Sequence, residues 1–213
     1  MKVFIWNILK FMHLGSIMLF IHPKSALRQL GWFKSFHKRQ VIDNMDNPIP
    51  WWTYSFNDFI SHRLTVEMRI LEFGCGASTI FLSQRVKEVV SFEIDSEWAK
   101  KTRESIKNGA IKIIDVKDLS DYSSYLDMIN GKYDILIIDN LGDRMQCAAN
   151  NLRHLKDNGV VIWDNTDGPD WTDIKSFMSK HSYKEISFTG MVAQELSYSK
   201  TTLFYRENNC LNI

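Results

Sequence analysis

The sequence predicts an α/β fold built on a doubly wound, mostly parallel sheet that ends in an antiparallel hairpin. From residue 68 onward, short apolar runs alternate with longer amphipathic segments. The apolar runs are continuous, as is typical of strands that are covered on both faces. The last two runs are about nine residues apart, which leaves no room for a crossover helix. Neighbouring strands joined without a crossover pair antiparallel, and this gives the closing hairpin.

The elements follow in order along the chain. Strands are expected over residues 69–73, 88–94, 111–115, 133–139, 159–164, 183–190 and 200–206. Helices are expected between them, over residues 78–86, 96–107, 119–130, 142–157 and 170–180. Gly131 and Gly159 each follow an expected helix and stand where a C-terminal cap belongs.

Three parts are expected in the chain: an apolar N-terminal helix over 1–21, an aromatic-rich segment over 22–64, and the α/β domain over 65–213. Within the first part, Asn7, Lys10 and His13 recur every three residues and therefore share one side of a helix. The opposite face is broad and apolar, which suits a helix in a membrane interface or docked on a partner. A spanning helix and a signal peptide are the alternatives.

Composition excludes some classes of protein. The 213 residues carry a net charge of +1 and are 45% hydrophobic, so no bulk field favours nucleic acid as a partner. Three widely spaced cysteines show no metal-ligand spacing and fit a reducing compartment. We therefore expect a cytoplasmic protein, peripheral at the membrane if residues 3–21 contact it. Whether the protein forms a homo-oligomer stays open.

Acidic residues close most of the predicted parallel strands. These strand-end residues are Glu72, Glu93, Asp115, Asp118, Asp139 and the pair Asp164 and Asn165. In an open parallel sheet, ligands bind beyond the carboxyl ends of the strands. Carboxylates gathered there repel one another unless cations or hydroxyl donors lie between them, so this edge is the predicted site.

The stretch "ILEFGCGAST" (70–79) predicts a nucleoside-binding turn after the first strand. Gly74 and Gly76 would let the backbone approach a ligand closely, but the third glycine of the dinucleotide fingerprint is missing. Ser78 offers a hydroxyl in its place. Glu93, twenty-one residues after Glu72, suits the two hydroxyls of a ribose. The missing third glycine and the closing hairpin together disfavour a dehydrogenase.

The segments "LEFGCGAST" and "SFEID", with the closing hairpin, resemble class I S-adenosylmethionine-dependent methyltransferases over residues of about 65–206. The resemblance implies a Rossmann-like, seven-stranded fold and S-adenosylmethionine as the cofactor of the domain over 65–213. It also implies which residues contact each part of the cofactor. The ribose would contact Glu93, and the adenine would contact Ile94 and Asp118, with Asp115 as the alternative to Asp118. The methionine part would contact Glu72, Gly74, Cys75, Gly76 and Ser78. Trp98 is expected in the core rather than over the adenine.

A narrower similarity links the chain to small methyltransferases encoded with surface-polysaccharide and natural-product genes. It rests on "NPIPWWTY", on the segment from "IDNLGDRM" to "VVIWDN", and on "TTLFYR". The fourth strand ends in Asp139-Asn140 where that group more often has Asp-Gly, which leaves the local loop geometry open. This similarity implies O-methylation of a sugar hydroxyl on a small-molecule or lipid-linked glycan precursor.

A sugar hydroxyl needs a base or a metal to react at neutral pH. Asp139, Asp164 and Asn165 offer oxygen ligands suited to Mg²⁺ and resemble the metal site of catechol-type O-methyltransferases. In the alternative, Asp139 is the base or binds the methionine ammonium, and Asp164-Asn165 only caps the next turn.

The acceptor is expected against Trp51, Trp52 and Tyr54, which would stack on a sugar or an aromatic ring, although adjacent tryptophans are also good core anchors. Arg144 could hold an anionic acceptor. Two other functions stay open: an aminopropyl-transferring synthase on the same scaffold, and a membrane-docked nucleoside-binding module without catalysis.

Overall fold

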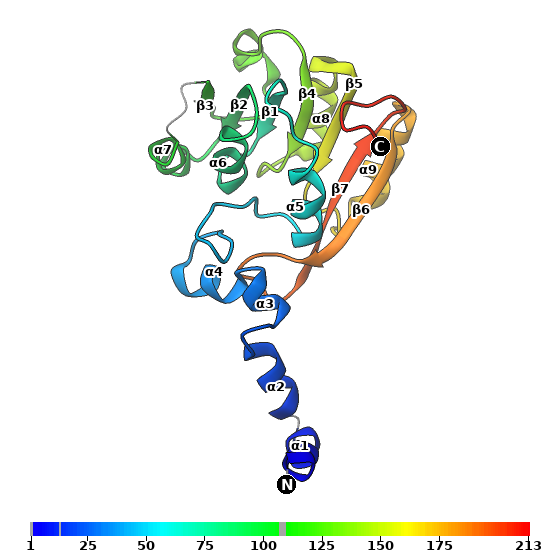
Figure 1. Ribbon diagram of the computed structural model, residues 1–213. Coiled ribbons are helices and arrows are strands. Elements are labelled where there is room, and N and C mark those ends of the chain that lie inside the picture. Colours follow the sequence, from blue (N-terminus) through cyan, green and yellow to red (C-terminus); the bar gives the residue numbers. More distant parts are fainter. Residues whose placement is uncertain (1, 13, 107–109) are drawn as a thin grey trace.

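The computed structural model describes residues 2–12, 14–106 and 110–213 (Figure 1). The strands are β1 Arg69–Phe73, β2 Glu88–Glu93, β3 Ile111–Asp115, β4 Tyr133–Ile138, β5 Leu155–Trp163, β6 Lys184–Met191 and β7 Tyr198–Tyr205. The α-helices are α1 Lys2–Phe11, α2 Leu14–Ile21, α3 Ala26–Gln29, α4 Trp32–Lys38, α5 Tyr54–Ser61, α6 Ala77–Ser83, α7 Ser96–Glu104, α8 Arg144–Asn151 and α9 Trp171–Lys180. Short 3₁₀ turns are η1 Tyr122–Ser124, η2 Leu126–Met128 and η3 Leu152–His154.

Within the described residues the seven strands form one sheet in the order β3-β2-β1-β4-β5-β7-β6. The first five strands in this order are parallel, and β7 runs antiparallel to both β5 and β6. The predicted α/β class, the mostly parallel sheet and the closing hairpin are therefore confirmed. Because the chain reverses its direction of crossover at β1, the ends of β1 and β4 lie at the topological switch point, where a ligand cleft is expected.

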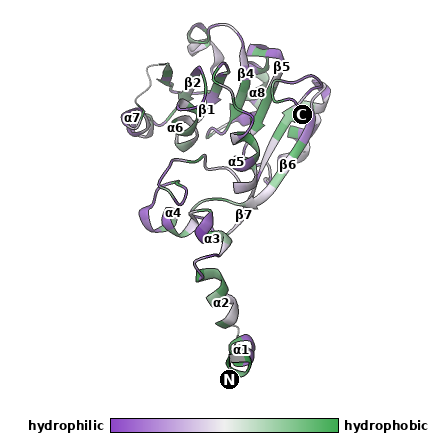
Figure 2. Cartoon of the chain, viewed as in Figure 1, coloured by the Kyte–Doolittle hydropathy of each residue, from purple (hydrophilic) through white to green (hydrophobic). Residues whose placement is uncertain are grey.

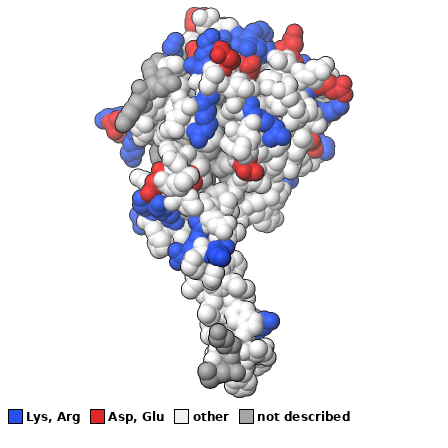
Figure 3. All heavy atoms as spheres, in the orientation of Figure 1, with Lys and Arg blue, Asp and Glu red and all other residues white. Residues whose placement is uncertain are grey.

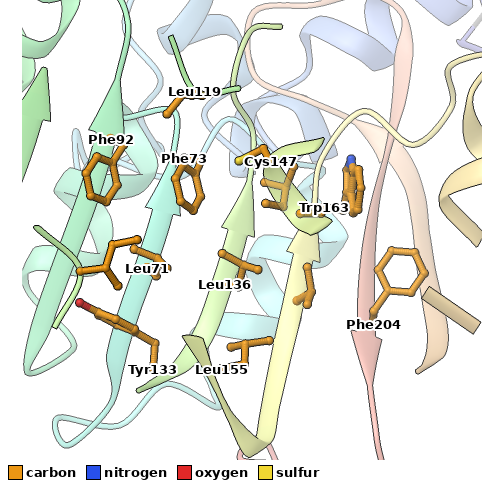
Figure 4. Packing of buried hydrophobic residues seen from close by; sticks show 14 of the residues in the cluster. Leu71, Phe73, Phe92, Leu119, Tyr133, Leu136, Cys147, Leu155, Trp163 and Phe204 are labelled. Atoms are coloured by element: carbon orange, nitrogen blue, oxygen red, sulfur yellow. The ribbon is translucent and has the colours of Figure 1, made fainter. Parts of the chain in front are cut away.

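Both faces of the sheet are buried, which explains why the strands are continuously apolar. On one face Leu71, Phe73, Phe92, Leu136 and Trp163 pack beneath α8 and α9 (Figure 4). Residues of the opposite register, among them Ile70, Ile137 and Leu203, pack against α5 and α6. The aromatic-rich N-terminal segment therefore supplies part of the cover of this second face through α5.

Two predicted helices differ from the structure. Residues 119–130 form η1 and η2 rather than a helix, because Asp118 and Asp121 hydrogen-bond the hydroxyls of Ser120 and Ser123 and compete with helical hydrogen bonding. Gly131 has φ +78° but caps no helix.

The helix expected over 142–157 is shorter, since α8 ends at Asn151 and β5 begins at Leu155. Leu155 pairs with Tyr133 at the start of β4, so the chain from Leu155 onward joins the sheet and does not continue the helix. Gly159 consequently lies inside β5 and not at a helix end. The helix expected over 96–107 ends at Glu104, and residue 107 lies outside the described residues.

The N-terminal helix expected over 1–21 is two helices, α1 and α2, with His13 outside the described residues. Along the described chain, no single helix has the length and apolar character needed to cross a bilayer. Among the described residues, only Val3–Phe11 and Leu14–Gln29 taken together have the required length and apolar character, and these two segments are bent by 105° relative to each other.

Candidate active site

A cavity of about 390 Å³ opens at the carboxyl edge of the sheet, over the ends of β1, β2 and β4. Its wall consists of Trp51, Gly74, Cys75, Gly76, Ala77, Ser78, Glu93, Asp95, Trp98, Asp139, Leu141, Arg144 and Asn165. Most of the residues expected to meet a cofactor are thus brought together in one place.

The turn after β1 needs glycine at its first position. Gly74 has φ +94°, and a Cβ atom there would lie 2.4 Å from the carbonyl oxygen of Asp139. The turn therefore lies directly against the end of β4, which any side chain would prevent. This close approach brings Asp139 to the floor of the cavity.

Glu93 joins the end of β2 to the same turn. Its Oε2 accepts the Cys75 backbone N–H at 2.9 Å, and its Oε1 accepts those of Ile94 and Asp95 at 2.9 Å each. A carboxylate has about four lone-pair sites, so these three bonds leave acceptor capacity toward the cavity. Glu93 thus lies in the cavity wall, and its contact with a ribose stays a prediction.

Glu72 lies behind the turn and does not line the cavity. Its carboxylate accepts the Ser78 hydroxyl at 2.6 Å and the Thr79 hydroxyl at 2.5 Å, and Thr79 in turn accepts the Gly76 N–H. Complete burial raises the pKa of Glu72 to about 7, against the lowering effect of these hydroxyls. Glu72 therefore positions the turn and does not reach the space where a cofactor would bind.

Asp139 is flanked by a cation and a second carboxyl. Desolvation raises its pKa to about 6, whereas the Arg144 guanidinium, 3.4 Å away, lowers it. Burial and the charge of Asp139 raise the pKa of Asp164 well above its ordinary value, although Asp164 accepts a hydrogen bond from the Thr201 hydroxyl at 2.5 Å. The burial of Asp164 and the like charge of Asp139 therefore both favour the protonated form of Asp164.

A smaller cavity of about 190 Å³ adjoins the first at the ends of β4 and β5. It is lined by Trp51, Asp139, Asp164, Asn165, Val192, Glu195 and Ser199. Trp51, Asp139 and Asn165 belong to the walls of both cavities, so the two meet at Asp139. The arrangement offers two adjoining chambers with one carboxylate between them.

Comparison with known proteins identifies the fold. No protein-family model and no curated protein matches the sequence. Among solved structures, a Staphylococcus aureus protein provisionally assigned as a caffeoyl-CoA O-methyltransferase shares 15% identity, covering 89% of this chain and 96% of that one, with a TM-score of 0.59. The O-methyltransferase TomG from Streptomyces achromogenes, crystallised with S-adenosylmethionine, shares 19% identity over 70% of this chain and 77% of its own, with a TM-score of 0.54.

A precorrin-6y C5,15-methyltransferase from Geobacter metallireducens is similar at 14% identity, over 70% of this chain and 85% of its own, with a TM-score of 0.56. The chain has the class I methyltransferase fold. At these identities the likeness establishes the architecture alone.

Within this methyltransferase fold, the aromatic residues divide differently from the prediction. Trp51 lines both chambers and donates its indole N–H to the Ala193 carbonyl at 2.9 Å. Trp52 is fully buried beside Phe56, and Tyr54 is buried near Trp32, so their expected contact with an acceptor is wrong. These two positions face the core because α5 begins at Tyr54 and packs against the sheet.

Three further residues differ from the cofactor contacts that the family resemblance implies. Asp118 is exposed after β3, bonded to Ser120, and Ile94 is half-buried against the core; neither is in the described wall of either chamber. Trp98, expected in the core, is 43% exposed and lines the larger chamber. It donates its indole N–H to the Cys75 carbonyl at 2.7 Å and so covers the turn from outside.

Two of the three side chains expected to bind a metal, Asp139 and Asn165, contact a guanidinium in this methyltransferase fold. Arg144 Nη2 lies 3.1 Å from Asn165 Oδ1 and 3.4 Å from Asp139 Oδ1, and Arg144 also donates to the backbone carbonyls of Asn140 and Asp164. In the described part of the chain, no three His, Cys, Asp or Glu side chains are grouped to hold a metal ion. Binding of a metal by Asp139, Asp164 and Asn165 stays a prediction.

Sequence reasoning missed the residues that complete the smaller chamber. Val192, Glu195 and Ser199 come from the connection between β6 and β7 and the start of β7. No motif marks them, because they reach the site only through the antiparallel pairing of β7 with β5. The predicted hairpin was the one available signal.

Proposed function

We propose that the protein is an S-adenosylmethionine-dependent methyltransferase that methylates a hydroxyl group. The observation that carries this proposal is the pair of chambers that meet at Asp139. The larger chamber has the glycine turn and Glu93 in its wall, and the smaller one has Trp51 and polar strand-end groups. One chamber for the cofactor and one for the acceptor, with a base between them, is what methyl transfer to a hydroxyl requires.

The residues of the larger chamber fit the proposed cofactor. The backbone of Gly74, Cys75 and Gly76 is open for close approach, and Glu93 keeps acceptor capacity for ribose hydroxyls. When bound, S-adenosylmethionine supplies an electrophilic methyl group on a sulfonium. The task of this chain is then to hold the acceptor in line with that group and to remove a proton.

In this proposal Asp139 is the base. A pKa of about 6 leaves it ionised at neutral pH yet basic enough to take a hydroxyl proton as the oxygen reacts. Arg144 stabilises the ionised form and fixes the carboxylate, a role that replaces its predicted contact with an anionic acceptor. Asp164, held by Thr201, lies in the wall of the smaller chamber with Asp139.

For the acceptor we propose a sugar hydroxyl on a glycan or natural-product precursor. Trp51 offers an aromatic surface of the kind that stacks on sugars. The ionisable side chains in the described wall of the smaller chamber are all acidic, namely Asp139, Asp164 and Glu195. They suit hydroxyl donors and disfavour a phosphate or carboxylate at the reacting end of the acceptor.

The first test is calorimetric titration with S-adenosylhomocysteine, beside an NAD control. We expect micromolar binding that Glu93→Ala weakens at least about tenfold, because a charged acceptor contributes about 1.5–3 kcal/mol. Glu97→Ala, an exposed glutamate on the neighbouring helix α7, is the matched control. Absence of binding by the folded wild type would contradict the proposal. Preference for the decarboxylated cofactor would support the aminopropyl-transferring alternative.

The second test separates a catalyst from a binding module. We expect Asp139→Asn to lower kcat about 10²–10⁴-fold on a sugar acceptor while the affinity for S-adenosylhomocysteine is kept. In the wild type, kcat/KM should rise with pH through about 6 and then level off, because the base acts only when deprotonated. Cofactor binding without turnover on any acceptor would favour the membrane-docked module.

The same assay tests the predicted metal. If Arg144 supplies the positive charge beside Asp139, EDTA leaves the rate unchanged. A loss of activity on EDTA treatment that added Mg²⁺ restores would assign Asp139, Asp164 and Asn165 to a metal site instead.

A further inference from the structure

The two N-terminal helices extend away from the α/β body as a stalk, formed by α1 and α2 (Figure 1). Their apolar side chains are exposed; Val3 is 73% exposed and Phe11 87% exposed. The other exposed apolar residues of the stalk are Phe4, Ile5, Ile8, Met12, Leu14, Ile17, Met18, Leu19, Phe20 and Ile21. Such a contiguous exposed apolar surface marks a site of interaction with a partner or a membrane.

The sequence of α2, LGSIMLFI, is apolar on every side. Ser16 is its one polar side chain, and Gly15 is its one buried residue. Figure 2 shows this helix as a hydrophobic segment between the body and α1. A helix that is hydrophobic all round is found buried, either in a protein core or in lipid. The described body does not cover α2, so its cover must come from outside.

Neither helix of the stalk is long enough to cross a bilayer by itself. Helices of ten and eight residues measure about 15 and 12 Å, against about 30 Å for the hydrocarbon core. Val3–Phe11 and the longer segment Leu14–Gln29 are bent by 105° relative to each other, which also prevents one straight span. Asn7 and Lys10 lie one turn apart on the same side of α1, which is the polar side expected for a helix lying in the interface.

Charge distinguishes this end of the chain from the rest. The first 42 residues contain seven Lys and Arg and no Asp or Glu, whereas the remaining residues contain 19 basic and 25 acidic ones. Figure 3 shows basic side chains gathered where the stalk joins the body. Asp46 neutralises Lys34 and Lys38, but Lys10 and Lys24 have no carboxylate partner among the described residues. Apolar helices beside a basic, acid-free segment are complementary to an anionic lipid surface.

We propose that α1 and α2 insert into the surface of an anionic bilayer, with Lys10, Lys24 and Arg28 at the level of the lipid headgroups. A second copy of the chain would bring two segments of the same positive charge together, which electrostatic repulsion opposes. An anionic lipid surface covers the apolar side chains of the helices and attracts the positive charge beside them. This inference needs no catalytic activity and is tested without it.

A hydrogen bond links the base of the stalk to the chamber proposed for the acceptor, and its meaning for the reaction rests on the proposed function. The indole N–H of Trp32, in α4 at the base of the stalk, donates to the Glu195 carbonyl at 2.8 Å. Glu195 lines the smaller chamber. Membrane insertion would therefore hold that chamber close to the bilayer, which suits a lipid-linked acceptor.

The test is flotation of the purified full chain with phosphatidylcholine vesicles, prepared with and without phosphatidylglycerol. We expect binding to the anionic vesicles that weakens as salt is raised. Phe20→Glu should reduce partitioning at least about tenfold, because it replaces an apolar ring that the bilayer would bury by a charge. Lys10→Gln and Lys24→Gln should each reduce it roughly fivefold on anionic vesicles.

Matched controls lie on the body: Val66→Glu for the apolar change and Lys100→Gln for the charge change, both at exposed positions away from the stalk. Both should bind as the wild type does, and circular dichroism should show that every variant is folded. The proposal is overturned if the wild type does not float with anionic vesicles, or if Phe20→Glu floats as the wild type does. Self-association that Phe20→Glu abolishes, without vesicle binding, would assign the stalk to a second copy.

Discussion

At the scale of single residues, Glu72 acts on the site from behind the cavity wall. It is fully buried, and the hydroxyls of Ser78 and Thr79 donate to it from the first turn of α6. These bonds hold the glycine turn in place, but they do not compensate fully for the loss of water, since the pKa rises to about 7. The turn is therefore fixed by a carboxyl that favours its protonated form when the protein is folded.

Glu72 makes the stability of the fold depend on pH. Its pKa is 4.5 in the unfolded chain and about 7 in the folded protein, so between these values the unfolded state binds fewer protons. The free energy of unfolding should consequently fall by about 3 kcal/mol as the pH rises from about 4.5 to 7. Glu72→Gln, which carries no charge, should show a fall smaller by about 3 kcal/mol than the wild type, the remainder coming from Asp139 and Asp164, whose pKa values are also raised. Urea unfolding at several pH values measures the fall. The exposed Glu67→Gln is the control, and a fall in Glu72→Gln as large as that of the wild type would refute the assignment.

At the scale of elements, two tryptophans fix the loops that close the two chambers. Trp51 donates its indole N–H to Ala193 in the connection between β6 and β7, beside the smaller chamber. Trp98, in α7, donates to Cys75 in the turn after β1, beside the larger chamber. Each loop is thus held by one hydrogen bond from a ring that also forms part of the wall.

Substitution by phenylalanine removes each hydrogen bond and keeps most of the ring. If the proposed chambers are correct, Trp51→Phe should raise the KM of the acceptor about fivefold, because a neutral hydrogen bond contributes about 1 kcal/mol. Its affinity for S-adenosylhomocysteine should change less, because the hydrogen bond that is lost lies beside the smaller chamber. Trp98→Phe should show the reverse pattern, so each variant is the control for the other. Equal effects of both variants on both ligands would argue against two separate chambers.

At the scale of the whole molecule, the body owes its stability to the two faces of the sheet and little to the stalk. The core clusters on these faces contain no residue of α1 or α2 among the described residues. In contrast, Trp32 of α4 is 5% exposed and packs with Tyr54 and Ala193. The chain before α3 is therefore attached to the body without being part of its core.

Deletion of residues 1–21 should leave the free energy of unfolding within about 1 kcal/mol of the full chain, because little apolar surface is buried by these helices. Trp32→Ala should lower it by about 3 kcal/mol through loss of a buried ring. Chemical denaturation of both variants measures the difference. A large loss of stability on deletion would mean that the stalk packs against the body in solution.

The sequence by itself determined the sheet and the position of the site. Apolar runs and their spacing placed all seven strands, Gly74 and Gly76 marked the turn, and Glu93 and Asp139 marked the strand ends that line the cavity. These features are local, because a buried strand must be apolar and a tight turn must have glycine. Parallel topology then brings successive strand ends to one edge without further information.

Only the tertiary structure decided which side chains face the cavity. Trp51 and Trp52 are neighbours of the same type, yet one lines both chambers and the other is buried in the core. Glu195 and Ser199 reach the site through the pairing of β7 with β5, and the helix expected at 142–157 ends early because Leu155 joins the sheet. Such outcomes depend on contacts between residues far apart in the chain, whose energies outweigh the local preferences that the sequence displays.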